Sequence, residues 1–549
     1  MISVPSIKRI AVRAASAIMA AAMLATSVAY ADEPYSGYNY DWWGDPVPSQ
    51  NGYVVEKVVS GLDIGCGALS QPSDMFFSDK DELYVADTNY VGSIDPNNQK
   101  GRIVITDKDF NLVNTIEYLD FSGVRSWLDG KDADLQAGEL DAARYAKETN
   151  IYFKGPTGVF VDEDDIVYVA DNENERVVAF TSEKDSDGNG YGKVITVYTR
   201  PESNVYDSTT TFYPSKVLVD AAKNVYVCIK SITKGAVVFS KEGEFSGYYG
   251  ANRVEQTGEV VLNAFWKLIF TRDQIKRMKR NVPVEITNFD IDDDNFVYTV
   301  TESKSANTDV LKKLNSAGTN IFTNLGYSDY DFGDPLTKYY RGQTYSSQIT
   351  DVDIGDNGVI NLLDLKTGRV FQYDDECNLL FIFGGIGSQK GTFTTVNSVE
   401  SVGTNVYVLD GRKCTITVFG QTEFGAIVHN AISLFNKGKY EEAREPWNEV
   451  LRRDSNYWLA YIGLGNAYLN EGNYEQAMKY FYHNSKTGYS DAFKGWRMDF
   501  IRDNFTLFAV IILVLLAGIY VLSSVRGKKR AKKRAAADAL LRAQQKKEE

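Results

Sequence analysis

Residues 155–180 read GPTGVFVDEDDIVYVADNENERVVAF, and residues 193–198 read KVITVY. This stretch contains four short runs of β-branched and aromatic residues, separated by turns rich in Asp, Asn and Gly. Such a pattern predicts four antiparallel strands joined by tight turns, which together form one small β-meander. A single meander cannot bury its own apolar side chains, so it needs neighbours of the same kind.

The same unit recurs through most of the chain. Six copies align on two positions thirteen residues apart, namely Asp74 with Asp87, Gly158 with Asp171, Lys216 with Ile229, Asn288 with Thr301, Asp351 with Asp364 and Asn397 with Asp410. The repeat predicts a mainly β chain in which residues 54–423 form a six-bladed β-propeller. The sixth copy supplies only three strands, and we expect the strand-like residues 54–59 to complete it and close the ring.

The second copy carries a family motif. Residues 168–171 read YVAD and are followed by Asn174, Arg176 and an apolar strand. This pattern resembles the NHL repeat, and the resemblance implies a β-propeller. The match is partial in the first and sixth copies and weak in the third and fourth, where Ile229 and Thr301 replace the acid. We interpret the repeated Asp as structural, because its carboxylate can accept N–H bonds from the following turn.

A helical repeat follows the propeller. Gly438, Tyr440, Ala443 and Trp447 recur 34 residues later as Gly472, Tyr474, Ala477 and Phe481. This spacing over residues 424–490 resembles a pair of tetratricopeptide repeats, which implies antiparallel helical hairpins with aromatic side chains packed on small residues. Two interpretations stay open, namely a groove that binds a peptide or protein, and a spacer between the propeller and a membrane.

Both ends of the chain carry segments typical of a membrane protein. Residues 1–31 combine basic residues, an apolar run and a small-residue cleavage pattern, and so predict a signal peptide. Residues 505–525 contain no charged residue and, at about 1.5 Å per residue, are long enough to cross a bilayer core of roughly 30 Å. Seven basic residues between 526 and 534 predict a single-pass protein of the cell membrane with its N-terminus outside and its C-terminus in the cytoplasm.

These signals divide the chain into predicted segments. In order, they are a signal peptide (1–31), an N-terminal segment (32–53), the propeller (54–423), the helical repeats (424–490), a juxtamembrane segment (491–504), the transmembrane helix (505–525) and a basic cytoplasmic tail (526–549).

Composition excludes several classes of function. The chain has 59 Lys and Arg against 73 Asp and Glu, a net charge of −14, and an acidic surface disfavours a nucleic-acid partner. It has only two histidines, His429 and His483, and both follow the predicted propeller, which disfavours a histidine base or a histidine-bound metal there. The four cysteines show no C-x-x-C spacing, so we do not expect a disulfide framework.

The start of each innermost strand gives the candidate ligand site of the propeller. Carboxylates and amides that converge on one axis suit Ca²⁺ or the hydroxyl groups of a sugar. The candidate ligand-binding residues are Asp74, Lys216, Asn288, Asp351 and Asn397. Gluconolactonase-like propellers hold a divalent metal one position earlier, where this chain has Ser73, Thr157, Ser215, Thr287, Thr350 and Val396, which are poor ligands. We therefore expect no cofactor. Ca²⁺ is the one metal ion that the carboxylate and amide oxygens of this ring would suit.

Two further segments are candidates. Asp185, Asp187 and Asn189 match the first half of an EF-hand loop, although Thr196 stands where that loop needs Glu, and a plain hairpin turn is the favoured interpretation. Residues 261–280 depart from strand patterning and combine aromatic with basic side chains. Their candidate interaction residues are Phe265, Trp266, Lys276 and Arg277, which would meet a partner or the anionic membrane surface, or simply cover one end of the propeller.

The favoured function is a membrane-anchored binding or scaffold protein that engages an extracellular protein or a carbohydrate. The alternative is a tethered gluconolactonase-like hydrolase or lyase that uses Asp74, Asn288, Asp351 and Asn397 around a divalent ion. Propellers host many activities, so the architecture alone does not decide between the two.

Overall fold

The computed structural model describes residues 34–35, 37–41, 44–91, 100–206, 210–251, 284–302, 310–322, 332–334, 338–340, 343–345, 347–355 and 358–548. The predicted signal peptide and the candidates Phe265, Trp266, Lys276 and Arg277 lie outside the described residues. The chain divides into two compact units, Met1–Ser433 with Arg452–Tyr457, and Leu434–Leu451 with Trp458–Glu549.

Within the described residues, the first unit contains six blades. Blade 1 consists of β4 (Pro72–Phe77), β5 (Glu82–Val91), β6 (Lys100–Asp107) and β7 (Leu112–Asp120). Blade 2 consists of β8 (Pro156–Val161), β9 (Val167–Asp171), β10 (Arg176–Lys184) and β11 (Gly190–Thr199). Blade 3 consists of β12 (Pro214–Val219), β13 (Val225–Ile229), β14 (Gly235–Phe239) and β15 (Phe245–Gly250). Blade 4 consists of β16 (Asn288–Ile291), β17 (Val297–Val300) and β18 (Leu311–Leu314). Blade 5 consists of β21 (Ile349–Ile354), β22 (Ile360–Asp364), β23 (Arg369–Tyr373) and β24 (Leu379–Gly384). Blade 6 consists of β25 (Val396–Val402), β26 (Asn405–Asp410), β27 (Thr415–Gln421) and β3 (Tyr53–Ser60).

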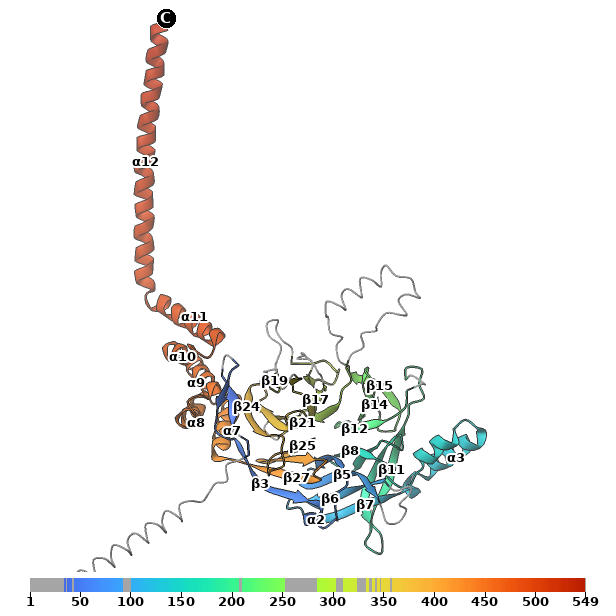
Figure 1. The fold of residues 1–549 in the computed structure, drawn as a ribbon. Helices are drawn as coiled ribbons and strands as arrows, with labels where there is room; N and C mark the ends of the chain where they lie inside the picture. The colour runs from blue at the N-terminus through green and yellow to red at the C-terminus, as the bar shows by residue number, and fades with distance from the viewer. Residues whose placement is uncertain are drawn as a thin grey trace, which may run out of the picture. The chain divides into compact units, whose positions relative to one another are not determined.

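The ring closes as the sequence predicts. Figure 1 shows β3, from the start of the propeller, beside β27 from its end, and the two strands pair antiparallel from Thr415↔Ser60 to Gln421↔Tyr53. Each innermost strand contacts the next in the order β4, β8, β12, β16, β21, β25, and β25 contacts β4. The six-bladed propeller is therefore confirmed, and the N-terminal strand β3 completes the last blade.

The stretch that predicts the meander is buried on both faces. Val167, Val169, Val177 and Phe180 are all 0% exposed, because each blade is covered by a neighbour on either side. The motif Arg176 is also fully buried, and its guanidinium donates to the Asp171 carboxylate at 2.9 Å. This pairing confirms the structural interpretation of the repeated Asp in the second copy.

Blades 1 and 2 are joined more closely than the repeat alone implies. Their outer strands β7 and β11 pair in parallel, so the two blades share one eight-stranded sheet. The insertion between them folds as a 3-10 turn η1 (Phe121–Val124) and two helices, α3 (Arg125–Ala137) and α4 (Ala142–Glu148). Smaller elements of this unit are β1 (Tyr38–Tyr40), β2 (Pro46–Pro48), α2 (Gly61–Ile64), β19 (Lys338–Tyr340) and β20 (Gln343–Tyr345).

Helices follow the propeller. They are α7 (Glu423–Asn436), α8 (Tyr440–Arg453), α9 (Trp458–Asn470), α10 (Tyr474–Phe481), α11 (Lys486–Asp503) and α12 (Phe505–Glu548). In the second unit Trp447 lies against Gly463 and Phe481 against Gly465, where a Cβ would meet each ring at 2.4–2.5 Å. These contacts are of the aromatic-on-small kind that the repeat spacing predicts.

Helix α12 carries the predicted membrane segment. It is 44 residues long, and its apolar part is long and apolar enough to cross a membrane. The helix continues without a break from the apolar residues 505–525 into the basic tail.

Candidate functional site

The innermost strands bring the candidate ring together at the centre of the propeller. Within each blade the first strand pairs with the second, and this register identifies the equivalent positions. They are Asp74 (opposite Ala86), Gly158 (Ala170), Lys216 (Cys228), Asn288 (Val300), Asp351 (Leu363) and Ser398 (Leu409). Four of the five predicted ligand-binding residues therefore occupy equivalent places, and the sixth blade contributes Ser398.

The structure corrects the alignment at Asn397. Residues paired across the first hairpin are twelve apart in blade 1 (Asp74 and Ala86) but eleven apart in blade 6 (Ser398 and Leu409), because the β25–β26 turn is one residue shorter. A count of thirteen residues back from Asp410 therefore reaches Asn397, one residue before Ser398. Ser398 is the residue that occupies the place equivalent to Asp74 at the centre of the propeller, which we call the axial position. The side-chain amide of Asn397, in blade 6, donates a hydrogen bond to the backbone oxygen of Pro72, in blade 1, at 2.8 Å. Asn397 therefore links two neighbouring blades.

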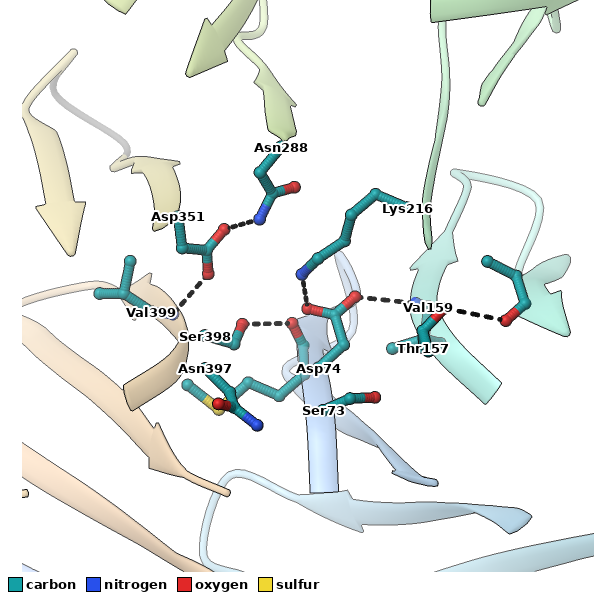
Figure 2. Close-up of polar contacts among 12 residues, drawn as sticks. Ser73, Asp74, Thr157, Val159, Lys216, Asn288, Asp351, Asn397, Ser398 and Val399 are labelled. Carbon is teal, nitrogen blue, oxygen red and sulfur yellow. Dashed lines mark hydrogen bonds and ion pairs between the residues drawn. The ribbon is translucent and has the colours of Figure 1, made fainter. Parts of the chain in front are cut away.

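Asp74 joins three blades. Figure 2 shows Lys216 of blade 3 pointing at its carboxylate, and the two form an ion pair in which the side chains are 15% and 7% exposed. The other carboxylate oxygen accepts the backbone N–H of Val159, in blade 2, at 2.9 Å. Both oxygens of Asp74 are thus engaged by neighbouring blades.

Asp351, on β21 of blade 5, links neighbouring blades in the same way. One of its oxygens accepts the Asn288 side-chain amide of blade 4 and the N–H of Val352, and the other accepts the N–H of Val399, in blade 6, at 2.7 Å (Figure 2). The innermost strand of a blade has a sheet neighbour on one side only, so its other edge presents N–H groups that need an acceptor. The axial carboxylates supply that acceptor.

A second layer of acids lies two residues further along the same strands. Asp290 accepts the N–H of Ile354, Asp353 accepts the N–H and hydroxyl of Ser401, and Glu400 accepts the N–H of Phe77. Each of these bonds crosses from one blade to the next. The candidate residues predicted from the sequence do not include these acids, although side chains two positions apart on a strand point to the same face, so the first layer indicates where the second lies.

Burial governs the protonation of this cluster. It raises the pKa of Asp351 to about 7, against the lowering effects of Lys216 and the Val399 N–H, and the Asp74 charge adds to the rise. Burial and the neighbouring Asp353 hold the pKa values of Asp290 and Glu400 well above their ordinary range. For Lys216, burial lowers the pKa, but the carboxylates of Asp74 and Asp351 outweigh it and the net shift is upward. Lys216 is therefore charged at neutral pH, while Asp351 titrates there.

The polar contacts of this cluster run between blades. Across the described ranges, no group of three or more His, Cys, Asp or Glu side chains is placed to hold a metal ion. The carboxylate oxygens instead converge on backbone N–H groups and on the Lys216 ammonium. The axial cluster thus holds the ring of blades together.

The segment that matches half of an EF-hand loop forms a hairpin turn. One oxygen of Asp185 accepts the N–H groups of Asp187 and Asn189 at 2.9 and 2.8 Å, between β10 and β11. Asp107 and Asp374 bond the residues two and four positions ahead in the same way in other blades. The hairpin interpretation accounts for these contacts.

A buried polar chain links the axial acids to helix α7. The Asp353 carboxylate accepts the Asn361 amide, Asn361 accepts the Gln372 amide, and Gln372 accepts Nε2–H of His429. Because Gln421 donates to the remaining ring nitrogen, this arrangement requires a neutral imidazole. Burial lowers the pKa of His429 to about 4, in agreement with that state. His429 therefore positions α7 within the first unit.

An open groove of about 680 Å³ lies at the rim of blades 2 and 3. We call it the rim groove. It is lined by the end of β11, the start of α3, and the β14–β15 turn. Its wall combines apolar and charged side chains, including Trp127, Ile195, Phe245, Glu242 and Glu244. Ile195 is 43% exposed and faces the groove.

All four cysteines are free thiols. Cys228 is buried in β13, while Cys66, Cys377 and Cys414 are partly exposed. The propeller is thus closed by strand pairing and packing without a disulfide framework, as the cysteine spacing predicts.

Comparisons with known proteins agree with the motif in blade 2. Residues 153–180, which span β8, β9 and most of β10, match the NHL repeat family model. No curated protein shows significant sequence similarity to the chain.

Among solved structures, virginiamycin B lyase from Staphylococcus aureus is 8% identical over 67% of this chain and 100% of its own, with a TM-score of 0.35. A PQQ-bound aldose sugar dehydrogenase from Streptomyces coelicolor is 10% identical over 68% of this chain and 99% of its own, also with a TM-score of 0.35. A protein of unknown function from Bacteroides thetaiotaomicron is 11% identical over 70% of this chain and 76% of its own, with a TM-score of 0.37. Because these TM-scores are below 0.5, they support no inference about activity. The assignment of a propeller fold rests on the strand pairing and on the contacts between blades.

Proposed function

We propose that this protein is a membrane-anchored extracytoplasmic binding or scaffold protein. Helix α12 tethers it in a single pass with the N-terminus outside, and the basic residues after position 525 favour that orientation. The propeller, together with helices α7 to α10 as tetratricopeptide-like repeats, engages an envelope protein or a carbohydrate-bearing ligand.

The observation that carries the proposal is the rim groove. Binding sites combine apolar and aromatic walls with a few polar groups, and Trp127 and Phe245 with Glu242 and Glu244 provide both. The axial cluster, by contrast, is engaged in inter-blade bonds. The proposal therefore places recognition at the rim of the propeller.

A crosslinking experiment in intact membranes tests this proposal. A photoreactive benzoyl-phenylalanine replaces Ile195 in the groove or, as the matched control, Ile386, an equally apolar residue that is 54% exposed in the segment after β24. We expect one adduct of defined size from position 195, its loss when Trp127→Ala is added, and none from position 386. Equal labelling from both positions, or no adduct from 195, contradicts the proposal.

A channel enzyme is the second candidate, and one observation favours it. Asp351 is buried beside the Lys216 and Asp74 ion pair, and burial raises its pKa to about 7, a value that suits a general acid or base. The purified full-length protein is assayed with aldonolactones, with and without added Ca²⁺. Turnover that Asp351→Asn abolishes, while the melting curve stays cooperative, supports the enzyme; absence of turnover supports the binding protein.

A further inference from the structure

Helix α11 has two different faces. Gly488, Ala492 and Gly495 form one of them and pack on the preceding helix: a Cβ at Gly488 would lie 2.7 Å from the Phe481 ring, and one at Gly495 would lie 2.3 Å from Tyr474. Ala492 is fully buried. This small-residue face attaches α11 to α10.

A neighbouring face carries a ladder of aromatic rings. Phe493 stacks on Trp496 with centroids 5.8 Å apart, and Trp496 stacks on Phe500 at 5.5 Å. These residues recur at the i, i+3, i+7 spacing of one helix face. Phe493 and Phe500 are 42% and 47% exposed and Trp496 between them is partly exposed, so the helices of its own unit leave the ladder partly uncovered. We call it the aromatic stripe.

The aromatic stripe is continuous with the membrane segment. Helix α11 ends at Asp503, helix α12 begins at Phe505, and the Phe500 ring contacts the Phe508 ring of the apolar segment at 6.1 Å. Any bilayer that α12 crosses therefore has its surface within a turn or two of Phe500. Aromatic side chains are favoured at that depth, because their rings suit the boundary between headgroups and acyl chains.

The charges of α11 agree with such a position. Lys494 pairs with Asp491 at 2.8 Å and Arg502 with Asp499 at 2.9 Å, while Arg497 is exposed. Residues 491–503 carry three basic and three acidic side chains, so their formal charge is zero. Surface attraction to anionic lipid is therefore small, and the burial of aromatic area is the main driving force.

We infer that the aromatic stripe Phe493, Trp496 and Phe500 is inserted in the interfacial layer of the same bilayer that α12 spans, and that α11 holds the helical repeats against the lipid surface. This inference rests on the proposed anchoring by α12 and adds a second, monotopic contact to it. The occupant is the headgroup boundary of a zwitterionic bilayer.

The experiment uses the full-length protein reconstituted into phosphatidylcholine vesicles. Flotation of the vesicles, followed by alkaline carbonate extraction, first reports whether α12 anchors the chain. Tryptophan emission is then compared in vesicles whose lipids carry bromine high on the acyl chain, low on the chain, or not at all. The difference between wild type and Trp496→Phe isolates the emission of Trp496, and Trp447→Phe is the matched control because Trp447 is 2% exposed within the same unit.

We expect the Trp496 component to lose about half its intensity with the shallow bromine label and less with the deep one, since interfacial helices bury their apolar face by about 5–10 Å. Trp447→Phe should leave the brominated-lipid effect unchanged. An anchored protein whose Trp496 is quenched by aqueous iodide but not by brominated lipid overturns the inference alone. A protein that fails to float with the vesicles overturns both the inference and the proposed anchoring.

Discussion

Asp74 and Lys216 form an ion pair at the centre of the propeller, although 142 residues separate them in the chain. The pair joins blade 1 to blade 3, and Asp74 also bonds the backbone of blade 2. The axis of the ring is thus held by charge and hydrogen bonds, whereas the blade interfaces around it are apolar.

Removing the cation should weaken the propeller. Lys216→Met leaves the buried Asp74 carboxylate without its ion-pair partner, and breaking one side of a buried pair costs about 3 kcal/mol. We expect a lower midpoint in urea at pH 8 for the full-length protein in detergent. Lys80→Met is the control, since the Lys80 side chain is 64% exposed and its loss should leave the midpoint unchanged. Equal midpoints for the two variants would refute this expectation.

The axial acids should make stability fall as pH rises. The folded protein raises the pKa of Asp351 from 3.8 to about 7, so it holds this proton more tightly than the unfolded chain does. Stability from this residue is therefore greatest below the unfolded pKa and is lost as pH rises from about 4 to about 7. Asp290 and Glu400 shift in the same direction. In Asp351→Asn, the decline in melting temperature over this interval should be smaller than in wild type; an identical decline would exclude Asp351 as its source.

His429 should have the opposite effect. The folded state lowers its pKa from 6.5 to about 4, so the unfolded chain binds the proton first and stability is lost as pH falls through that interval. His429→Leu should reduce this acid-side loss, and at pH 7.5 it should cost about 2 kcal/mol because Gln372 and Gln421 lose a buried partner. Melting curves at pH 7.5 and 4.5 test both effects. His483→Leu, at an exposed position, should reproduce the wild-type values.

The buried Arg176 should not tolerate lysine. Its guanidinium bonds the Asp171 carboxylate and Glu148 O, so it ties blade 2 to the end of helix α4. Lysine lacks the fork that makes both bonds, and we expect Arg176→Lys to cost about 3 kcal/mol in chemical denaturation. Arg412→Lys serves as the control, because Arg412 bonds Asp410 through its backbone N–H. A loss of the same size in both variants would show that the fork is unimportant.

The amino-acid sequence by itself determined the six-bladed propeller, its closing strand and the long apolar helix. Turn residues, β-branched runs and an uncharged segment are local properties, and six pairs of positions thirteen residues apart, such as Gly158 and Asp171, mark the repeated unit along the chain although the units differ in length. The strand at 54–59 could be assigned because the sixth copy lacked its fourth strand, and the pairing of β3 with β27 confirms it.

The tertiary structure alone decided what the axial residues do. Asn397 was misplaced by one residue because the first hairpin of blade 6 is one residue shorter than that of blade 1, so Ser398 lies twelve residues before Asp410 whereas Asp74 lies thirteen before Asp87. The inter-blade bonds of Asp74 and Asp351 depend on how consecutive blades stack, and the bond from Phe77 N–H to Glu400 depends on closure of the ring, since it joins the first blade to the last. Local sequence specifies strands and turns, whereas contacts between residues far apart in the chain follow from how the blades stack.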